Sequence, residues 1–351
     1  MTVEKLKKAL RNKQPKTTLV STLHYLSTGS TLLNLAFSNL AQGGFVPGLC
    51  YSFVGDSNSG KTWLAMSALA EATIDPHFKE YRLIFDNAEN GSHMDVEKYF
   101  GKKAFERIER IEPSTTLEQF YDRMGDINGS YVAVLDSMDA LWTDSEAEQV
   151  QKEKAARARG KDTTGSYGTS KAKLNSSRLR VLTNGLKDTG SILILISQTR
   201  DNIGFGAKFQ PKTYAGGNAI KFYSRIQMWT SVKKRLKKTY KEKDHIIGTL
   251  MQVKVTKNHV TGWEGAVDVP IIRGVGIDDL GACVDYLIDM GHWKKSKAGI
   301  NAPELGVILP REELIAHVEK DELEDELREV IEIVWHETQT ATQIIRKSRY
   351  L

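Results

Sequence analysis

Short apolar runs alternate with longer polar stretches between residues 51 and 196. Five of these runs predict strands, at 51–54, 82–85, 107–111, 131–135 and 192–196. Because nearly every position in the runs is apolar, we expect the strands to be buried on both faces, as in a parallel sheet covered by helices. The pattern therefore predicts an α/β fold with a mostly parallel central sheet.

After Ile226 the pattern changes to an alternation with a period of two. This alternation predicts antiparallel strands at 226–232, 249–256 and 265–271, added to the same sheet. Residues 278–290 have the periodicity of an amphipathic helix. The stretch 293–299 is basic and is expected to be a connector, and the chain from Pro310 onward is expected to form charged helices.

These elements divide the chain into an N-terminal helical arm over 1–26, a core over 27–293 and a small C-terminal helical region over 294–351. Two long, polar, glycine-containing segments interrupt the core, at 144–173 and 201–217, and both are expected to be loops. Long loops inside a compact domain are usually functional. Both follow the carboxyl ends of predicted strands, where open α/β sheets bind their ligands.

The chain has 351 residues and a formal net charge of +5. It contains no apolar run long enough for a membrane span and no apolar signal core, so we expect a cytoplasmic protein without a membrane partner. Its two cysteines, Cys50 and Cys283, are expected to be buried thiols of a reducing compartment. Positive charge gathers at 152–161 and 233–243, and each segment is a candidate contact for a polyanion.

The segment that follows the first predicted strand fits the phosphate-binding pattern G-x-x-x-x-G-K-[ST]. Its residues are, in order, Gly55, Asp56, Ser57, Asn58, Ser59, Gly60, Lys61 and Thr62. The glycines let the backbone approach phosphates closely, and N–H groups at the start of the next helix point at the anion. Lys61 is expected to reach the β- and γ-phosphates of ATP, and the Thr62 hydroxyl is expected to bind Mg²⁺.

Other strand ends carry side chains that hydrolysis of ATP requires. Asp136 follows the fourth predicted strand and is expected to bind Mg²⁺ beside Thr62. Hydrolysis needs a carboxylate that polarises the attacking water; Glu89 is the preferred candidate and Asp86 is the alternative. Gln198, after the fifth strand, is expected to contact the γ-phosphate and to transmit its presence to the loop that follows.

These residues, in this order, resemble the RecA family of strand-exchange recombinases. The similarity extends from about residue 26 to residue 293 and includes segments at 27–30, 48–54, 88–90, 136–141, 197–200, 216–223, 254–258 and 274–277. The segment 216–223 is the most specific for the family. The resemblance implies ATP-dependent homologous recombination and DNA repair by a protein that forms helical filaments on single-stranded DNA and exchanges that strand with a duplex.

The resemblance also implies where partners bind. ATP would lie between neighbouring subunits, with Lys257 contacting the neighbour's nucleotide, and the N-terminal arm would pack on the next subunit. The two long loops would bind single-stranded DNA through cations and stacking aromatic rings. The residues expected there are Lys171, Lys173, Arg200, Phe205, Lys208, Phe209, Lys212, Tyr214, Gly216, Gly217 and Asn218. Proteins that load the filament or that bind single-stranded DNA are further candidate partners.

Departures from the family pattern keep other functions open. Asp86 lies one residue further from Glu89 than usual, and His259 stands where the family usually has a second lysine beside the neighbour's nucleotide. A neutral imidazole would weaken that contact, so a recombination mediator that hydrolyses ATP slowly is one alternative. A ring-forming DNA helicase of the same fold is another, and a small-molecule kinase is the weakest. The segment 233–243 is expected to form a basic hairpin tip that binds duplex DNA or the DNA backbone.

Overall fold

The computed structural model describes residues 24–91, 94–159, 170–201, 212–214, 217–344 and 346. Its main sheet has the strand order β10-β9-β8-β7-β1-β5-β4-β2-β3, and β6 pairs with β5. The pairings from β7 to β3 along this order are all parallel. In chain order, the first five strands of this parallel part are β1 (Cys50–Gly55), β2 (Arg82–Asp86), β3 (Ile108–Arg110), β4 (Tyr131–Leu135) and β5 (Ile192–Asp201). The predicted α/β fold with a mostly parallel sheet is confirmed.

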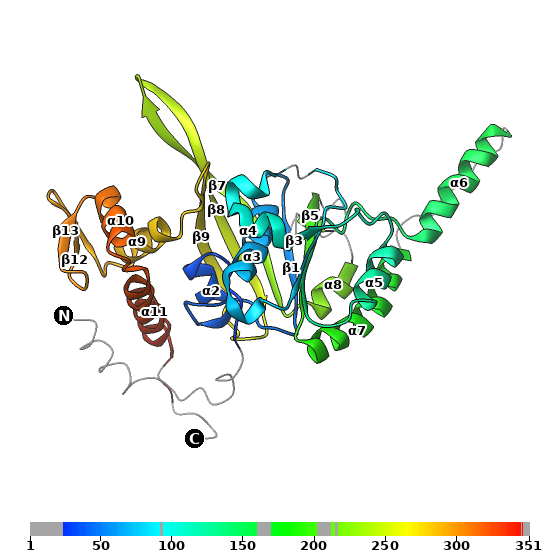
Figure 1. Ribbon diagram of the computed structural model, residues 1–351, viewed down its shortest axis with the longest axis horizontal. Helices are drawn as coiled ribbons and strands as arrows, with labels where there is room; N and C mark the ends of the chain where they lie inside the picture. Colours follow the sequence, from blue (N-terminus) through cyan, green and yellow to red (C-terminus); the bar gives the residue numbers. More distant parts are fainter. Residues whose placement is uncertain are drawn as a thin grey trace.

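Antiparallel strands extend the sheet on the other side of β1, as the alternating pattern predicts. They are β7 (Ile226–Tyr240), β8 (Lys243–Asn258), β9 (Gly265–Ile272) and β10 (Gly276–Ile277). However, β7 and β8 continue well past their predicted ends. Residues 233–248 form a hairpin, called the hairpin arm below, that projects from the sheet (Figure 1). Most side chains of the outer arm are exposed on both faces, so its sequence carries no alternation. The arm's exposed cations are Lys233, Lys234, Arg235, Lys237, Lys238, Lys241 and Lys243.

Helices cover both faces of the sheet, because neighbouring strand residues point to opposite sides. Phe53 and Ile194 belong to one core, and Leu135 and Leu193 belong to the other. The first core is covered by α2 (Thr31–Ser38), α3 (Lys61–Ile74), α4 (Val96–Arg107) and α9 (Asp279–Asp289). The second is covered by α5 (Leu117–Gly125), α7 (Ser170–Thr189) and α8 (Gly217–Tyr223). Both cysteines are buried, as expected.

The prediction of a loop over 144–173 is wrong for most of its length. Residues Asp144–Ala158 form α6, which projects from the body of the molecule (Figure 1), and α7 begins at Ser170. Thr143 and Glu146 form a capping box at its start. The Thr143 N–H donates to Glu146 Oε2 at 2.9 Å, and the Glu146 N–H donates to Thr143 Oγ1 at 3.1 Å. This cap and a run of alanine, glutamate and lysine explain the helix.

The C-terminal region contains a small sheet that the sequence did not predict. Its strands are β11 (Lys294–Ser296), β12 (Gly299–Ala302) and β13 (Val307–Leu309), followed by α10 (Arg311–Lys320) and α11 (Glu324–Ala341). The connector predicted at 293–299 is therefore wrong. Trp293 is buried and its Nε1 donates to Glu304 Oε2 at 2.8 Å, which anchors this sheet. The Trp335 ring packs on Trp263, with centroids 5.1 Å apart.

Several predicted features lie outside the described residues. These are the N-terminal helix and the parts of the two loops at 160–169, 202–211 and 215–216. Within the described part of the chain, no helix is both long and apolar enough to span a bilayer.

Candidate active site

The phosphate-loop pattern lies between β1, which ends at Gly55, and α3, which begins at Lys61. Gly60 has a φ of +89°, and a Cβ there would lie 1.8 Å from the sulfur of Met251. A Cβ on Gly55 would lie 2.2 Å from Thr230 Oγ1. The loop can therefore approach β7 and β8 this closely only because both residues are glycines. The first N–H groups of α3 have no partner within the helix and are available to an anion.

The Lys61 side chain lies back along the phosphate loop. Its Nζ donates to the carbonyl oxygens of Gly55 at 2.9 Å and Asp56 at 2.7 Å. Burial lowers the pKa of Lys61, and the nearby carboxylates of Asp136 and Glu89 oppose this shift. The amine is thus held by backbone acceptors beside the N-terminus of α3, within reach of an anion bound there.

Thr62 and Asp136 meet where α3 begins and β4 ends. Thr62 Oγ1 donates to Asp136 Oδ2 at 2.7 Å. Burial raises the pKa of Asp136, and the hydrogen bond from Thr62 opposes the shift. A hydroxyl and a carboxylate side by side supply the oxygen ligands that Mg²⁺ prefers, so this pair fits the ion.

Glu89 and Gln198 line the same cavity as the phosphate loop. Gln198 Nε2 donates to Glu89 Oε1 at 2.6 Å and thereby joins the segment after β2 to the end of β5. The Glu89 N–H donates to the carbonyl of Asp136 at 2.9 Å. The carboxylate of Glu89 is therefore held beside the Thr62–Asp136 pair.

Asp86, the alternative catalytic carboxylate, has different surroundings. Its side chain is 1% exposed and lies 3.5 Å from Arg123. Its two oxygens accept hydrogen bonds from the Ser114 N–H at 2.9 Å and from Ser114 Oγ at 2.5 Å. Asp86 does not line the cavity that contains Glu89, and its contacts fix the segment after β3.

Comparisons with known proteins identify the family of the chain. The sequence profile of the RecA N-terminal domain matches residues 9–278. The RecA protein of Chlorobium limicola is 31% identical over 281 residues, which cover 77% of this chain and 71% of that protein. The RecA protein of Rickettsia bellii is 32% identical over 76% of this chain and 73% of its own length. The RecA protein of Bacteroides thetaiotaomicron is 30% identical over 79% of this chain and 77% of its own length. The chain belongs to the RecA family.

Membership of the RecA family confirms the predicted resemblance and makes this chain a recombination and repair protein. Filament formation, strand exchange and DNA-dependent hydrolysis of ATP are general properties of this family.

Asp139 contacts this candidate site through Gln198 and was not among the predicted site residues. Its Oδ2 accepts from the Gln198 N–H at 2.7 Å, and its Oδ1 accepts from Arg200 at 3.2 Å. Burial raises the pKa of Asp139, and the Gln198 N–H opposes this shift. Its place three residues after Asp136 is the one signal that the sequence offered. Arg200, predicted to bind DNA, is paired here with a carboxylate.

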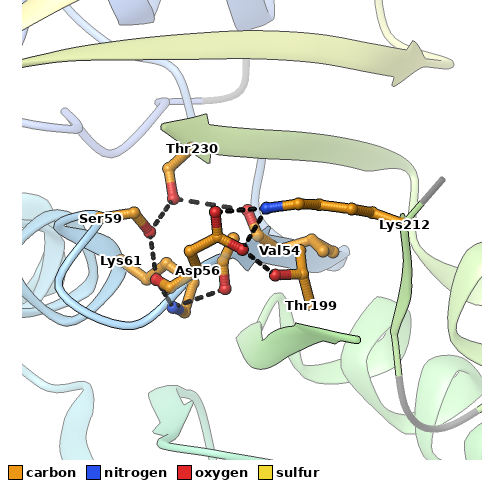
Figure 2. Close-up of polar contacts among 8 residues, drawn as sticks. Val54, Asp56, Ser59, Lys61, Thr199, Lys212 and Thr230 are labelled. Atoms are coloured by element: carbon orange, nitrogen blue, oxygen red, sulfur yellow. Dashed lines mark hydrogen bonds and ion pairs between the residues drawn. The ribbon is translucent and has the colours of Figure 1, made fainter. Parts of the chain in front are cut away.

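Asp56 connects the phosphate loop with β6 (Lys212–Tyr214), which pairs with the end of β5. Lys212 Nζ lies 2.6 Å from Asp56 Oδ1, and Thr199 Oγ1 donates to the same carboxylate (Figure 2). Hydrogen bonding by Lys212, and then by Thr199, lowers the pKa of Asp56. Lys212, predicted to bind DNA, thus contacts the phosphate loop of its own chain.

Lys257, predicted to contact a neighbour's nucleotide, lies away from the cavity in its own chain. Its Nζ donates to the carbonyl oxygens of Lys221 at 2.6 Å, Phe222 at 3.1 Å and Ser224 at 2.6 Å, at the C-terminal end of α8. Burial lowers the pKa of Lys257. These contacts place its amine at the end of a helix where carbonyl oxygens lack intrahelical partners.

The other predicted DNA-binding residues are spread over the loop ends. Tyr214 accepts from Gln227 Nε2 at 2.7 Å, so its hydroxyl is tied to the sheet. Lys171 lies 3.8 Å from Glu146, and Lys173 is exposed. Asn218 is exposed on α8, which begins at Gly217, whereas Phe205, Lys208, Phe209 and Gly216 lie outside the described residues.

Proposed function

We propose that this chain binds ATP and Mg²⁺ at the phosphate loop, polymerises on single-stranded DNA, and exchanges that strand with a homologous duplex while hydrolysing ATP to ADP and phosphate. The hydrogen bond between Gln198 and Glu89 is the observation that carries this proposal. It joins the candidate catalytic carboxylate to the strand end that leads into the second predicted DNA loop.

Lys61, Thr62 and Asp136 would hold the nucleotide. The Lys61 ammonium group would turn from its backbone acceptors to the β- and γ-phosphates, and the N–H groups at the start of α3 would bind phosphate oxygens. Thr62 Oγ1 and an Asp136 oxygen would ligate Mg²⁺, which neutralises charge on the phosphates when bound.

Glu89 would orient the attacking water and accept its proton. Gln198 would exchange its hydrogen bond with Glu89 for one with the γ-phosphate when ATP is present. Because Gln198 belongs to β5, this exchange would link the nucleotide state to the position of the strand that leads into the DNA-binding segment. Lys257 and the N-terminal arm would act between subunits, as the family resemblance implies.

The test compares Glu89→Gln with Glu80→Gln, which removes an exposed carboxylate outside the cavity. Glu89→Gln should lower the rate of DNA-stimulated ATP hydrolysis by about 10²–10⁴-fold, while binding of ATP and of single-stranded DNA persists. Glu80→Gln should hydrolyse ATP like the wild type. A Glu89→Gln protein with the wild-type rate would refute the assigned role.

A further inference from the structure

The ion pair between Asp56 and Lys212 joins two parts of the site that are far apart in sequence. Lys212 Nζ contacts both carboxylate oxygens of Asp56, and Thr199 Oγ1 donates to one of them. The pairing of β5 with β6 sets Asp201 opposite Lys212 and Thr199 opposite Tyr214. Through these contacts, the first residue after β1 is tied to both strands that flank residues 202–211 (Figure 2).

Asp56 brings negative charge into a loop whose proposed ligand is also negative. Hydrogen bonding by Lys212 and Thr199 lowers the pKa of Asp56, so its carboxyl group is ionised at neutral pH. An ionised carboxylate repels a nearby triphosphate unless a cation lies close to it. Among the described residues, Lys212 is the cation whose amine contacts this carboxylate.

We propose, as an extension of the function proposed above, that Lys212 is a positioning residue for nucleotide binding and does not contact DNA phosphates. It neutralises Asp56 and holds the phosphate loop against β5 and β6. Loss of the lysine alone leaves the carboxylate uncompensated and weakens ATP binding. Loss of both charges removes the repulsion and restores binding.

The experiment measures binding of a fluorescent ATP analogue with Mg²⁺ to the full chain, which requires no turnover. Lys212→Gln should raise the dissociation constant roughly threefold to fivefold, the size expected for a half-exposed ion pair. Lys212→Arg, which keeps the charge, should bind like the wild type, and the double variant Asp56→Asn/Lys212→Gln should recover most of the lost affinity. Thermal unfolding of each variant checks that it is folded.

The salt dependence of binding to single-stranded DNA separates this role from a DNA contact. Each phosphate contact contributes about 0.7 to the slope of log affinity against log salt. The slope should be unchanged in Lys212→Gln and should fall in Lys173→Gln, which changes an exposed lysine predicted to bind phosphate.

Two results would overturn the proposal: a lower salt slope for Lys212→Gln with unchanged nucleotide affinity, or a double variant that binds nucleotide as weakly as Lys212→Gln. A wild-type chain that binds no nucleotide would instead refute the proposed function, and this extension with it.

An independent cluster forms where His24 meets the short helix η1 (Pro76–Phe78). His24 Nε2 lies 2.6 Å from Asp75 Oδ2, and His77 Nδ1 lies 3.1 Å from Asp75 Oδ1. The two imidazole rings stack with centroids 3.6 Å apart. Each of the three side chains offers one potential ligand atom, and these three atoms lie within 4.8 Å of one another.

We infer that this cluster binds a divalent transition-metal ion of the Zn²⁺ type. Two imidazoles and a carboxylate, with a water molecule as fourth ligand, form a common zinc coordination set. Both ring nitrogens already face one carboxylate, so the ion would replace the protons that they share with it, and these protons would pass to solvent. Both histidines are exposed, so their rings can rotate to the required distance of about 2.0–2.2 Å.

The test titrates the full chain with Co²⁺ and records the visible absorption of a tetrahedral site, which added Zn²⁺ should remove. Zn²⁺ should also raise the melting temperature, because it binds only the folded cluster. His77→Ala and His24→Ala should lose both effects, whereas His245→Ala, which changes an exposed histidine of the hairpin arm, should keep them. Binding that survives His77→Ala would indicate an adventitious ion only and would overturn the inference.

Discussion

Glu89 and Asp86 are separated by two residues, yet their carboxylates have different surroundings. Glu89 lies in the cavity of the phosphate loop and accepts from Gln198, whereas Asp86 is buried and accepts two hydrogen bonds from Ser114. The sequence pattern favours Glu89 as the catalytic carboxylate and leaves Asp86 as an alternative, because a linear pattern does not show which partner each carboxylate contacts. The structure favours Glu89, since only its carboxylate shares the cavity with Lys61.

Asp86→Asn should lower the free energy of unfolding by about 1–3 kcal/mol, because the amide removes the buried negative charge that faces Arg123 and weakens the hydrogen bonds from Ser114. Urea denaturation measures this change. Glu89→Gln should leave the unfolding midpoint close to that of the wild type. If Asp86→Asn abolished hydrolysis while the unfolding midpoint was unchanged, Asp86 would be the base instead.

Several side chains of the site have partners that the sequence did not predict, because these partners lie far away along the chain. Lys212 and Asp56 are 156 residues apart, and Gln198 and Asp139 are 59 residues apart. Gln198 and Asp139 meet because neighbouring parallel strands bring their carboxyl ends to one edge of the sheet, whereas Lys212 reaches Asp56 because β6 pairs antiparallel with the end of β5. The sequence predicts that such an edge exists. The order of the strands in the sheet determines which side chains meet there, and that order is visible only in the folded chain.

At the scale of elements, the sequence predicts buried strands better than exposed ones. The strand predicted at 131–135 is found as Tyr131–Leu135, with every residue buried. The hairpin predicted at 233–243 is found, but its strands were predicted to end at 232 and to begin again at 249, because an arm in solvent needs no apolar face. The helix α6 was missed because the glycines that follow it suggested a loop, although the capping box at Thr143 was a readable signal.

The turn of the hairpin arm gives a prediction at this scale. Lys241 and Glu242 join Tyr240 to Lys243, with φ values of 47° and 60°. A two-residue turn with positive φ at both positions favours Asn-Gly. Lys241→Asn/Glu242→Gly should stabilise the arm by roughly 1–2 kcal/mol, seen as slower amide hydrogen exchange in β7 and β8. Unchanged exchange would contradict the turn geometry.

The contact between α2 and α9 predicts a dependence of stability on pH. Asp279 accepts from the Thr31 N–H at 2.6 Å and from Thr31 Oγ1 at 2.7 Å, and burial raises its pKa. The folded state therefore favours the protonated form. The contribution of this group to stability is fully present below its unfolded pKa and is lost as pH rises through its folded pKa.

Asp279→Asn stays neutral at every pH, and its amide can still pair with both Thr31 groups. Its free energy of unfolding relative to the wild type should therefore increase as pH rises through the folded pKa of Asp279. Denaturation of both proteins at a series of pH values measures the difference. A difference that is constant with pH, or that grows towards acid, would contradict the assigned shift.

At the scale of the whole molecule, the phosphate loop, Asp136 and Gln198 gather at the carboxyl ends of neighbouring parallel strands. The hairpin arm and α6 both project from this body (Figure 1), and both carry exposed basic side chains. The family, the fold and the place of the candidate site were predictable, because a few local motifs and strand patterns define them. The C-terminal sheet was not, because its short strands carry little periodicity.

The proposed function couples ATP binding and hydrolysis at this site to the formation of a filament on DNA. The most direct test measures ATP hydrolysis at fixed salt, with and without single-stranded DNA, and examines the same samples by negative-stain electron microscopy. We expect helical filaments and strong stimulation of hydrolysis by DNA, both lost in Lys61→Ala. Closed rings, filaments without turnover, or normal nucleotide-dependent filaments from Lys61→Ala would contradict it.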